Sequence, residues 1–587
     1  MTEYAGFAAL AVSALYALHF SWRRWPDPLI DAGHQLYTAW RLSEGAVLYR
    51  DVGSLYGPLS SHVNALLFRV FGAGMMVLVW ANLLVYATIV TLAYRLFRAV
   101  YGVGGALAAL AVFISIFSFN QLVPVGNYNY ALPYAHESTH GFTVALALIA
   151  LSGKWTMQGR RAQALGMGLL CGLAFVLKPE FMLVSFVVVG TALLLRLQRK
   201  HPPGWVETAL FGLAAATPML LFTIWFWRHL ALGAAFRAAN QAWWTVLVTR
   251  VHAQVWNSFL GTDAPAHNLA AMLVATGILV IGAGAMWLGA RRMARGSLFS
   301  GLLVPLPCVI ALAYVDWMQA AWCIPLALLV VLASRTVKLW RGTGTPQPAD
   351  EAQVLGLLLA VSAAALLARM SLHPRLYHFG FYQAALATMI VVAELLAFLR
   401  GSAGQHKAAS LVILASTALV IAAACLGILL RSQHLYSLRT YPVAEGRDRF
   451  LCFSPDREPS GFLVGKLVEE LRRAPVGDQV LVIPEGLMIN YLARRQSPLA
   501  EWIFIDLTLA GSAEARLVEK LVANPPAHVV LISRDLREHG IARFGATGQP
   551  GQQLLELVRR NYRPRFHLGG DPLDPNDRGA MLLARAM

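Results

Sequence analysis

Long apolar runs separated by polar loops recur along most of this chain, up to about residue 430. An α-helix of roughly 20 apolar residues crosses the hydrocarbon core of a bilayer. The composition agrees, because 57% of the 587 residues are hydrophobic and only 13% are charged. The sequence therefore predicts an all-α polytopic membrane protein with about thirteen transmembrane helices. The runs lie near residues 5–22, 74–94, 103–122, 140–153, 162–177, 181–197, 206–227, 267–289, 297–314, 319–334, 352–369, 379–399 and 408–430.

The character of the chain changes after residue 430. Residues 431–587 are rich in charged side chains and carry Pro and Gly between short regular runs. This pattern is typical of a soluble α/β domain. We expect a transmembrane domain over 1–430 and a C-terminal domain over 431–587 that acts as a lid or an acceptor-docking module without catalytic residues. The expected helices lie at 461–473, 513–522 and 552–560, and the expected strands at 479–483, 528–532 and 580–584.

The distribution of Lys and Arg predicts the orientation. The net charge is +17, but the basic residues are scattered at the ends of apolar runs, so we expect no nucleic-acid partner. Loops rich in Lys and Arg face the cytoplasm, which places the N-terminus inside and loop 23–73 outside. With an odd number of spans, the C-terminal domain lies outside as well. We expect the first run to be a retained helix and the protein to lie in a bacterial inner membrane.

Loop 23–73 gathers acidic residues in a chain that has few of them. Asp27, Asp31, Glu44 and Asp51 all lie there. A carboxylate held at a membrane surface is costly unless it is paired, hydrated or used, so the loop is predicted to form part of a functional site. The alternative is a solvated loop in which Asp27 and Asp31 cap short helices.

Another outward loop contains Glu137 between two histidines. His136 and His140 are spaced so that they share one face of a helix, as pairs of metal ligands do. The plainer interpretation is a pair of interfacial histidines, with Glu137 as a second acid of an outward-facing site. The five cysteines indicate neither a disulfide framework nor a metal cluster.

Basic residues at the outward ends of later runs are candidates for binding a phosphate. Lys178 ends the fifth run, and Arg369, Arg375 and His378 flank the loop before the twelfth. Arg binds a phosphate through its bidentate fork, and Lys binds it as a point charge. The alternative is that these side chains only reach from helix ends to the membrane surface.

Motifs in the first outward loop resemble those of a known family. They are Asp31-x-Gly33-x-x-x-Tyr37 through Arg41-Leu42-x-x-Gly45, then Leu48-Tyr49-Arg50-Asp51 and Tyr56-Gly57-Pro58-Leu59. The loop is similar to that of C-type membrane glycosyltransferases, in the branch related to protein O-mannosyltransferases and the lipid A aminoarabinose transferase. The helix ending 168–179 and the segment Pro484-Glu485-Gly486 with Asn490 and Arg495 look like the same family. Protein mannosyltransferases have an adjacent Asp-Glu pair where this chain has Asp31-Ala32, so only Asp31 carries over.

The resemblance implies transfer of a sugar from a polyprenyl-phosphate donor in the bilayer to a lipid, glycan or protein acceptor on the extracytoplasmic face. A single inverting displacement needs a base near the acceptor, cations for the leaving phosphate and an apolar groove. Asp31 is then the predicted base, and Glu137 assists it or helps to hold a divalent cation. The predicted substrate-binding residues are Lys178, Arg369, Arg375, His378, Asp51 and Tyr56.

A transporter or flippase of lipid-linked or small polar substrates is the alternative, because the same charges would line its pathway. The sequence shows no internal repeat or pair of broken helices, and transport does not require a large outward α/β domain. A non-catalytic scaffold for envelope assembly is a third alternative. One cavity shared by Asp31, Glu137 and the outward basic residues would favour the transferase, and a pathway open to both faces would favour the transporter.

Overall fold

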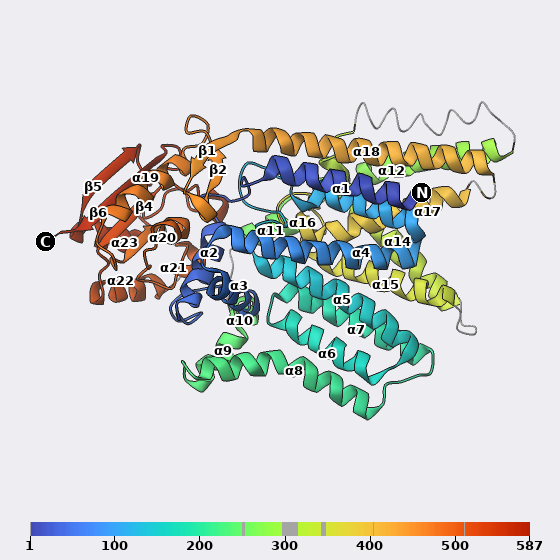
Figure 1. Ribbon diagram of the computed structural model, residues 1–587, viewed down its shortest axis with the longest axis horizontal. Coiled ribbons are helices and arrows are strands. Elements are labelled where there is room, and N and C mark those ends of the chain that lie inside the picture. The colour runs from blue at the N-terminus through green and yellow to red at the C-terminus, as the bar shows by residue number, and fades with distance from the viewer. Residues whose placement is uncertain are drawn as a thin grey trace.

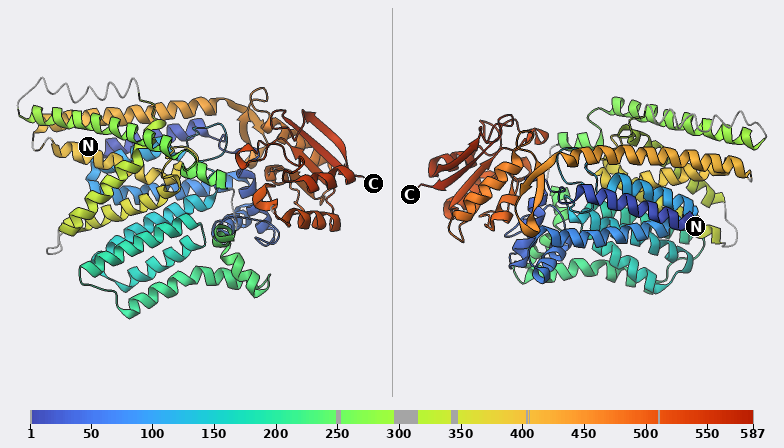
Figure 2. Two further views of the ribbon diagram at one scale, coloured as in Figure 1. Left: turned by 180° about the vertical axis from the view of Figure 1, so that it is seen from behind. Right: turned by 45° about the horizontal axis from the view of Figure 1, so that its top comes forward.

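The computed structural model describes residues 2–248, 253–295, 315–341, 348–402, 404, 406–509 and 511–586. A bundle of long helices carries a C-terminal domain at one end, and the N-terminus lies towards the other end (Figure 1). The first loop packs at the same end as the C-terminal domain, as the view from behind and the view tilted by 45° also show (Figure 2). The predicted class, a helical membrane protein with a C-terminal α/β domain, is confirmed.

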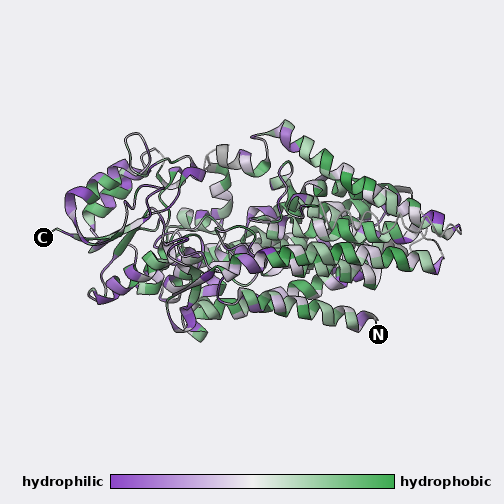
Figure 3. Cartoon of the chain, turned by 90° about the horizontal axis from the view of Figure 1, so that it is seen from above, coloured by the Kyte–Doolittle hydropathy of each residue, from purple (hydrophilic) through white to green (hydrophobic). Residues whose placement is uncertain are grey.

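The bundle is apolar along its length, whereas the C-terminal domain and the loops next to it are more hydrophilic (Figure 3). In the described ranges, nine helices are long and apolar enough to cross a membrane by length and composition. The predicted run 297–314 lies outside the described residues, and the number of about thirteen spans stays a prediction. The helices are α1 (Thr2–Ser21), α4 (Met75–Val112), α5 (His136–Gln158), α6 (Arg161–Phe175), α7 (Pro179–Gln198), α8 (Trp205–Trp227), α9 (Leu232–Ala239), α10 (Gln241–Val248), α11 (Ala253–Leu260), α12 (Pro265–Ala294), η3 (Gln319–Cys323), α14 (Ile324–Arg341), α15 (Pro348–Leu367), η4 (Ala368–Met370), α16 (Gly380–Gln383), α17 (Ala385–Ser402) and α18 (Lys407–Ser437).

Helix α4 is a hairpin of two helices, as the two apolar runs 74–94 and 103–122 predict. Gly102 has φ 69° and breaks the helix between them, a conformation that favours glycine. The rings of Tyr86 and Phe113 have centroids 6.0 Å apart, whereas a straight helix would separate these positions by about 40 Å. The chain therefore reverses at Gly102 and continues into the π-helical turn η1 (Phe113–Ser118).

Small residues on α6 allow α8 to pack closely against it. A Cβ atom on Gly168 would lie 2.2 Å from the Phe211 carbonyl oxygen, and one on Gly172 would lie 2.4 Å from that of Ala215. Both positions therefore tolerate only glycine at this separation of the two helices.

The C-terminal domain contains a four-stranded sheet of order β3-β4-β6-β5. Strands β3 and β4 are parallel, and β6 lies antiparallel between β4 and β5. The three predicted strands correspond to β3, β4 and β6, and the three predicted helices to α19, α22 and α23. A hairpin of β1 and β2 connects α18 to this sheet. The elements are β1 (Arg439–Val443), η5 (Gly446–Asp448), β2 (Phe450–Phe453), α19 (Ser460–Arg473), β3 (Val480–Ile483), α20 (Leu487–Ala493), α21 (Asp506–Leu509), α22 (Ala513–Ala523), β4 (His528–Ile532), η6 (Arg537–His539), α23 (Gln552–Asn561), β5 (Tyr562–Gly569) and β6 (Gly579–Arg585).

The first loop forms α2 (Ala32–Ser43) and α3 (Pro58–Phe71) and docks directly on the C-terminal domain. A Cβ atom on Gly33 would lie 2.2 Å from the backbone nitrogen of Met488. The backbone of α20 therefore fills the space beside Gly33. The Ser497 N–H donates to the Tyr37 hydroxyl (2.8 Å), and the Gly53 N–H donates to the Ala500 carbonyl (2.8 Å).

Candidate active site

Lys178 lies at the centre of a buried polar cluster. It follows α6 and immediately precedes Pro179, the first residue of α7, and only 2% of its surface is exposed. Its Nζ donates to the hydroxyls of Tyr134 (2.5 Å), Ser138 (3.3 Å) and Tyr382 (3.2 Å). A buried ammonium is stable only when it is paired and hydrogen-bonded, and this position is built to hold one.

A second cation completes the cluster. Glu180 Oε1 lies 3.6 Å from Lys178 Nζ and 2.8 Å from Arg369 Nη1. The guanidinium of Arg369 also covers the ring of Phe379 at 4.3 Å. Two cations thus share the Glu180 carboxylate. Lys178, Arg369 and Glu180 together therefore carry a net positive charge.

The first loop reaches Lys178 through Gly57. The Gly57 N–H donates to the Leu177 carbonyl (2.8 Å), and a Cβ atom on Gly57 would lie 2.1 Å from the Val176 carbonyl oxygen. This close approach places the ring of Tyr56 4.9 Å from Lys178 Nζ. Two of the motifs that carry the family resemblance, one in the loop and one at the end of α6, therefore meet at one point.

Glu137 is fully buried in the first turn of α5. Neither of its carboxylate oxygens has a hydrogen-bond partner among the described residues. It interacts electrostatically with Lys178 and Tyr56. A buried polar atom without a partner is costly, so this carboxyl is ready to receive a proton or a substrate hydroxyl.

The histidines beside Glu137 have other partners. The segment His136 to His140 reads His-Glu-x-x-His, the spacing of zinc metalloproteases. However, the His136 ring contacts Gln35 Oε1 (3.0 Å) and Asn82 Nδ2 (3.1 Å), and His140 Nδ1 contacts the hydroxyl of Ser60 (2.9 Å). Both rings therefore have partners inside the protein, and His136 is fully buried, not interfacial.

Asp31 precedes α2 with φ 56° and makes no helix-capping hydrogen bond through its side chain. Burial raises its pKa well above the usual value, and the negative charges of Glu485 and Asp27 raise it further, while Arg534 lowers it. Asp31 also interacts electrostatically with Tyr56, which connects it to the Lys178 cluster. A carboxyl with a raised pKa is a better proton acceptor once ionised.

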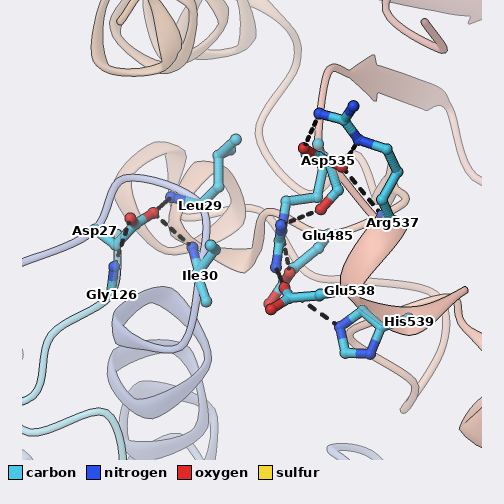
Figure 4. A network of polar contacts seen from close by, with 10 residues as sticks. Asp27, Leu29, Ile30, Gly126, Glu485, Asp535, Arg537, Glu538 and His539 are labelled. Atoms are coloured by element: carbon cyan, nitrogen blue, oxygen red, sulfur yellow. Dashed lines mark hydrogen bonds and ion pairs between the residues drawn. The ribbon is translucent and has the colours of Figure 1, made fainter. Parts of the chain in front are cut away.

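Asp27, in contrast, holds the turn before α2. Its Oδ1 accepts the N–H groups of Leu29 and Ile30 (3.0 Å each), and its Oδ2 accepts that of Gly126 (3.2 Å) (Figure 4). Asp27 therefore holds a turn and caps no helix, and Asp31 occupies the N-cap position of α2 without a capping hydrogen bond through its side chain.

The remaining candidates lie at the edge of the cluster or outside it. Arg375 Nη2 contacts the Ser258 carbonyl (2.8 Å) and His373 Nδ1 (2.7 Å). The ring of His378 packs on Tyr128 at 4.9 Å, and burial lowers the His378 pKa to about 4. This shift favours the neutral imidazole near pH 7, and the substrate-binding role of His378 stays a prediction.

Asp51 takes part in a local ion pair. Its carboxylate accepts two hydrogen bonds from Arg50 (2.8 Å each) and one from the Val47 N–H (2.8 Å). The Arg50 hydrogen bonds lower the Asp51 pKa. These contacts fix the turn between α2 and α3 and leave its substrate-binding role a prediction.

The C-terminal domain contributes charged groups that sequence reasoning missed. Arg534 pairs with Glu485 (3.0 Å) and Glu538 (2.6 Å), and this network faces the Asp27 turn (Figure 4). Both Glu485 and Arg534 act electrostatically on Asp31. The only sequence pattern that pointed to these groups was the Pro484-Glu485-Gly486 segment. The C-terminal domain, expected to be a lid or docking module, therefore also contributes to the electrostatic field at Asp31.

The donor set does not fit a resident divalent cation. Within the described ranges, no three His, Cys, Asp or Glu side chains are grouped as metal ligands. Glu137 has the Lys178 ammonium for a neighbour, and that positive charge opposes a second cation. We therefore assign no step to a metal.

Solved structures share this architecture. No protein-family model and no curated protein matches the sequence. The oligosaccharyltransferase of Archaeoglobus fulgidus, tethered with an acceptor peptide, aligns over 100% of this chain and 74% of its own, with 13% identity and a TM-score of 0.51. ArnT from Cupriavidus metallidurans, bound to undecaprenyl phosphate, aligns over 99% of this chain and 97% of its own, with 12% identity and a TM-score of 0.52. The chain therefore has the fold of the C-type membrane glycosyltransferases, as the motifs in loop 23–73 indicate.

Proposed function

We propose that this protein is a membrane glycosyltransferase that moves a hexosyl or pentosyl unit from a polyprenyl-phosphate donor to an acceptor on the extracytoplasmic face. The observation that carries the proposal is the position of the Tyr56 ring, 4.9 Å from Lys178 Nζ in the cluster of Lys178, Glu180 and Arg369. Two carboxyls, Asp31 and Glu137, interact electrostatically with this tyrosine. Carboxyls for the acceptor and cations for a leaving phosphate are the two requirements of the reaction.

Lys178 and Arg369 would receive the donor phosphate. Both are paired with Glu180, and together they retain one excess positive charge that a phosphate can balance. The ammonium and the guanidinium form strong charge-assisted hydrogen bonds with phosphate oxygens. The undecaprenyl phosphate bound to ArnT, a protein of the same fold, supports a polyprenyl donor.

Asp31 would act as the base. The acceptor oxygen or nitrogen bonds to the anomeric carbon as the bond from that carbon to the phosphate oxygen breaks. The acceptor proton passes to Asp31, and the polyprenyl phosphate leaves with the bonding electrons. Glu137 would hold a substrate hydroxyl, because its buried oxygens have no partner among the described residues. A single displacement of this kind inverts the anomeric configuration and needs no covalent enzyme intermediate.

The orientation is part of the proposal. The first loop and the C-terminal domain contact each other at one end of the bundle, so both face the same side. The positive-inside rule predicts that this side is extracytoplasmic. Reporter fusions after Arg161 and after Leu438 should report opposite faces of a bacterial inner membrane, and reports of the same face would contradict the orientation.

Membranes containing the protein, offered a panel of radiolabelled polyprenyl-phosphate hexoses and pentoses, test the reaction itself. We expect label to pass from at least one donor into a lipid, glycan or protein fraction. Donor movement between leaflets without transfer of the sugar would instead establish the transporter alternative. Absence of transfer from every donor would contradict the proposal.

A further inference from the structure

A small cavity lies where the second helix of the α4 hairpin ends. Its volume is about 10 Å³, and one water-sized particle needs about 10–15 Å³. Ile116 and Phe117, from the π-helical turn η1, form one part of its wall. Leu376 and Phe381, from the segment that leads into α16, form another part. The cavity therefore lies between two segments that are far apart in the chain and has room for a single small ligand.

Two amide side chains of this wall have fixed orientations. Asn120 and Gln121 both line the cavity, and they are 4% and 2% exposed. Asn120 Nδ2 donates to two backbone carbonyls of η1 (2.5 and 3.0 Å). Gln121 Nε2 donates to two backbone carbonyls of the following loop (2.5 and 3.1 Å). Because only the NH₂ end of an amide can donate to a carbonyl, these contacts fix which end of each amide is nitrogen and which is oxygen.

The oxygen of each amide has no donor. Neither Asn120 Oδ1 nor Gln121 Oε1 accepts a hydrogen bond from any residue that the structure describes. Buried polar atoms almost always have a partner, because leaving one without a hydrogen bond is costly. Two buried acceptors of neighbouring residues that line one cavity therefore favour a ligand that presents positive charge to both.

The electrostatics of the cavity favour a monovalent cation over a divalent one. The C-terminal end of a helix carries partial negative charge, and such ends, with unwound backbone carbonyls, coordinate Na⁺ in membrane proteins. Divalent cations such as Ca²⁺ and Mg²⁺ take carboxylate ligands, and none of the described residues that line the cavity is Asp or Glu. Arg375 acts electrostatically on His378, which belongs to the wall. This positive neighbour opposes a doubly charged ion more strongly than a singly charged one.

We propose that the cavity binds a single Na⁺ or K⁺ ion through Asn120 Oδ1 and Gln121 Oε1. The ion holds the loop after η1 against the segment 376–381, beside the hydrogen bond from the Tyr130 hydroxyl to the Phe381 carbonyl (3.1 Å). Tyr128 of this loop lines the cavity and interacts electrostatically with Asp31. The ion therefore orders a loop next to the candidate active site, and it takes part in no step of the transfer.

Hydrogen–deuterium exchange of the full-length protein in dodecyl maltoside tests binding without any variant. Samples are compared at equal ionic strength in NaCl, KCl and N-methyl-D-glucamine chloride. In NaCl or KCl, segments 119–130 and 376–381 should exchange more slowly by about threefold or more, and α22 of the C-terminal domain should be unchanged. Equal exchange in all three salts, or equal protection of α22, would overturn the inference and favour an ordered water. Protection by MgCl₂ or CaCl₂ but by neither monovalent salt would overturn the choice of ion.

Variants then assign the ligand atoms. Asn120→Leu and Gln121→Met remove an amide oxygen at similar side-chain volume. The measured quantity is the difference in unfolding temperature between NaCl and N-methyl-D-glucamine chloride, which the loss of the amide N–H contacts alone does not change. We expect a difference of about 2 °C in the wild type and none in either variant. Gln549→Met is the matched control, because Gln549 Oε1 is also buried without a partner among the described residues but lies outside the cavity. It should keep the wild-type difference, and the same difference in Asn120→Leu and Gln121→Met would overturn the assignment.

Discussion

Replacing Lys178 by Met is the sharpest test of the donor site. The substitution keeps a long, flexible side chain but removes an ammonium that donates to Tyr134, Ser138 and Tyr382. Breaking a buried ion pair by deleting one partner costs about 3–5 kcal/mol. Here Glu180 retains Arg369 at 2.8 Å, so we expect a loss near the lower end, about 3 kcal/mol of folding free energy.

The effect on the donor is separate from the effect on folding. A hydrogen bond from a charged donor contributes about 1.5–3 kcal/mol, which corresponds to roughly a 10- to 150-fold rise in donor KM if Lys178 contacts the phosphate. Transfer is measured against the concentration of the polyprenyl-phosphate sugar, and thermal unfolding in detergent reports the folded fraction. Both measurements are needed, because a loss of folded protein lowers the transfer rate without changing the donor KM.

Lys154→Met provides the matched control, because Lys154 is an exposed lysine near the end of α5 remote from Glu137. It should change neither quantity. If Lys178→Met folds and its donor KM equals that of the wild type, then Lys178 is a structural residue and the phosphate assignment to this cluster fails. Arg369→Met and Arg375→Met, measured in the same way, then decide whether another cation holds the phosphate.

Asp31→Asn should lower transfer about 100- to 10,000-fold, the usual contribution of a positioned base, with unchanged thermal unfolding; normal transfer would remove Asp31 from the chemistry. Asp27→Asn should instead lower the unfolding temperature more than the rate, because Asp27 holds backbone N–H groups. Since burial and Glu485 raise the Asp31 pKa while Arg534 lowers it, the wild-type rate should fall as pH drops through that raised pKa. Glu485→Gln should move this acidic limb to lower pH and Arg534→Gln to higher pH, and coincident profiles would contradict the electrostatic coupling. Gly33→Ala places a Cβ atom 2.2 Å from the backbone of α20, so it should make the C-terminal domain more sensitive to protease, whereas wild-type resistance would contradict this close packing.

Local patterns account for the parts of the fold that could be predicted. The buried strands β3 and β4 read as short apolar runs, and α19 is amphipathic, so their positions follow from the sequence. Strand β5 was missed because most of its side chains are exposed and it contains Pro564, which gives no apolar alternation. It is a strand only because it pairs with β6.

In the candidate site, too, some features follow from local sequence patterns and others depend on tertiary contacts. Lys178 and Arg369 could be found because charge at the end of an apolar helix is costly and therefore informative. The influence of Glu485 on Asp31 could not be predicted, since it depends on a contact between segments more than 400 residues apart in the chain. The lowered pKa of His378 depends likewise on tertiary burial.

The tight seam between the first loop and the C-terminal domain limits how this protein can be recombined with its structural relatives. Gly33 meets the backbone of α20, Tyr37 accepts from Ser497, and Gly53 donates to Ala500. A chimaera that exchanges the C-terminal domain alone would break all three contacts at once. Engineering a new specificity, or tracing which segments evolved together, therefore requires residues 23–57 and 439–586 to be treated as one interchangeable module.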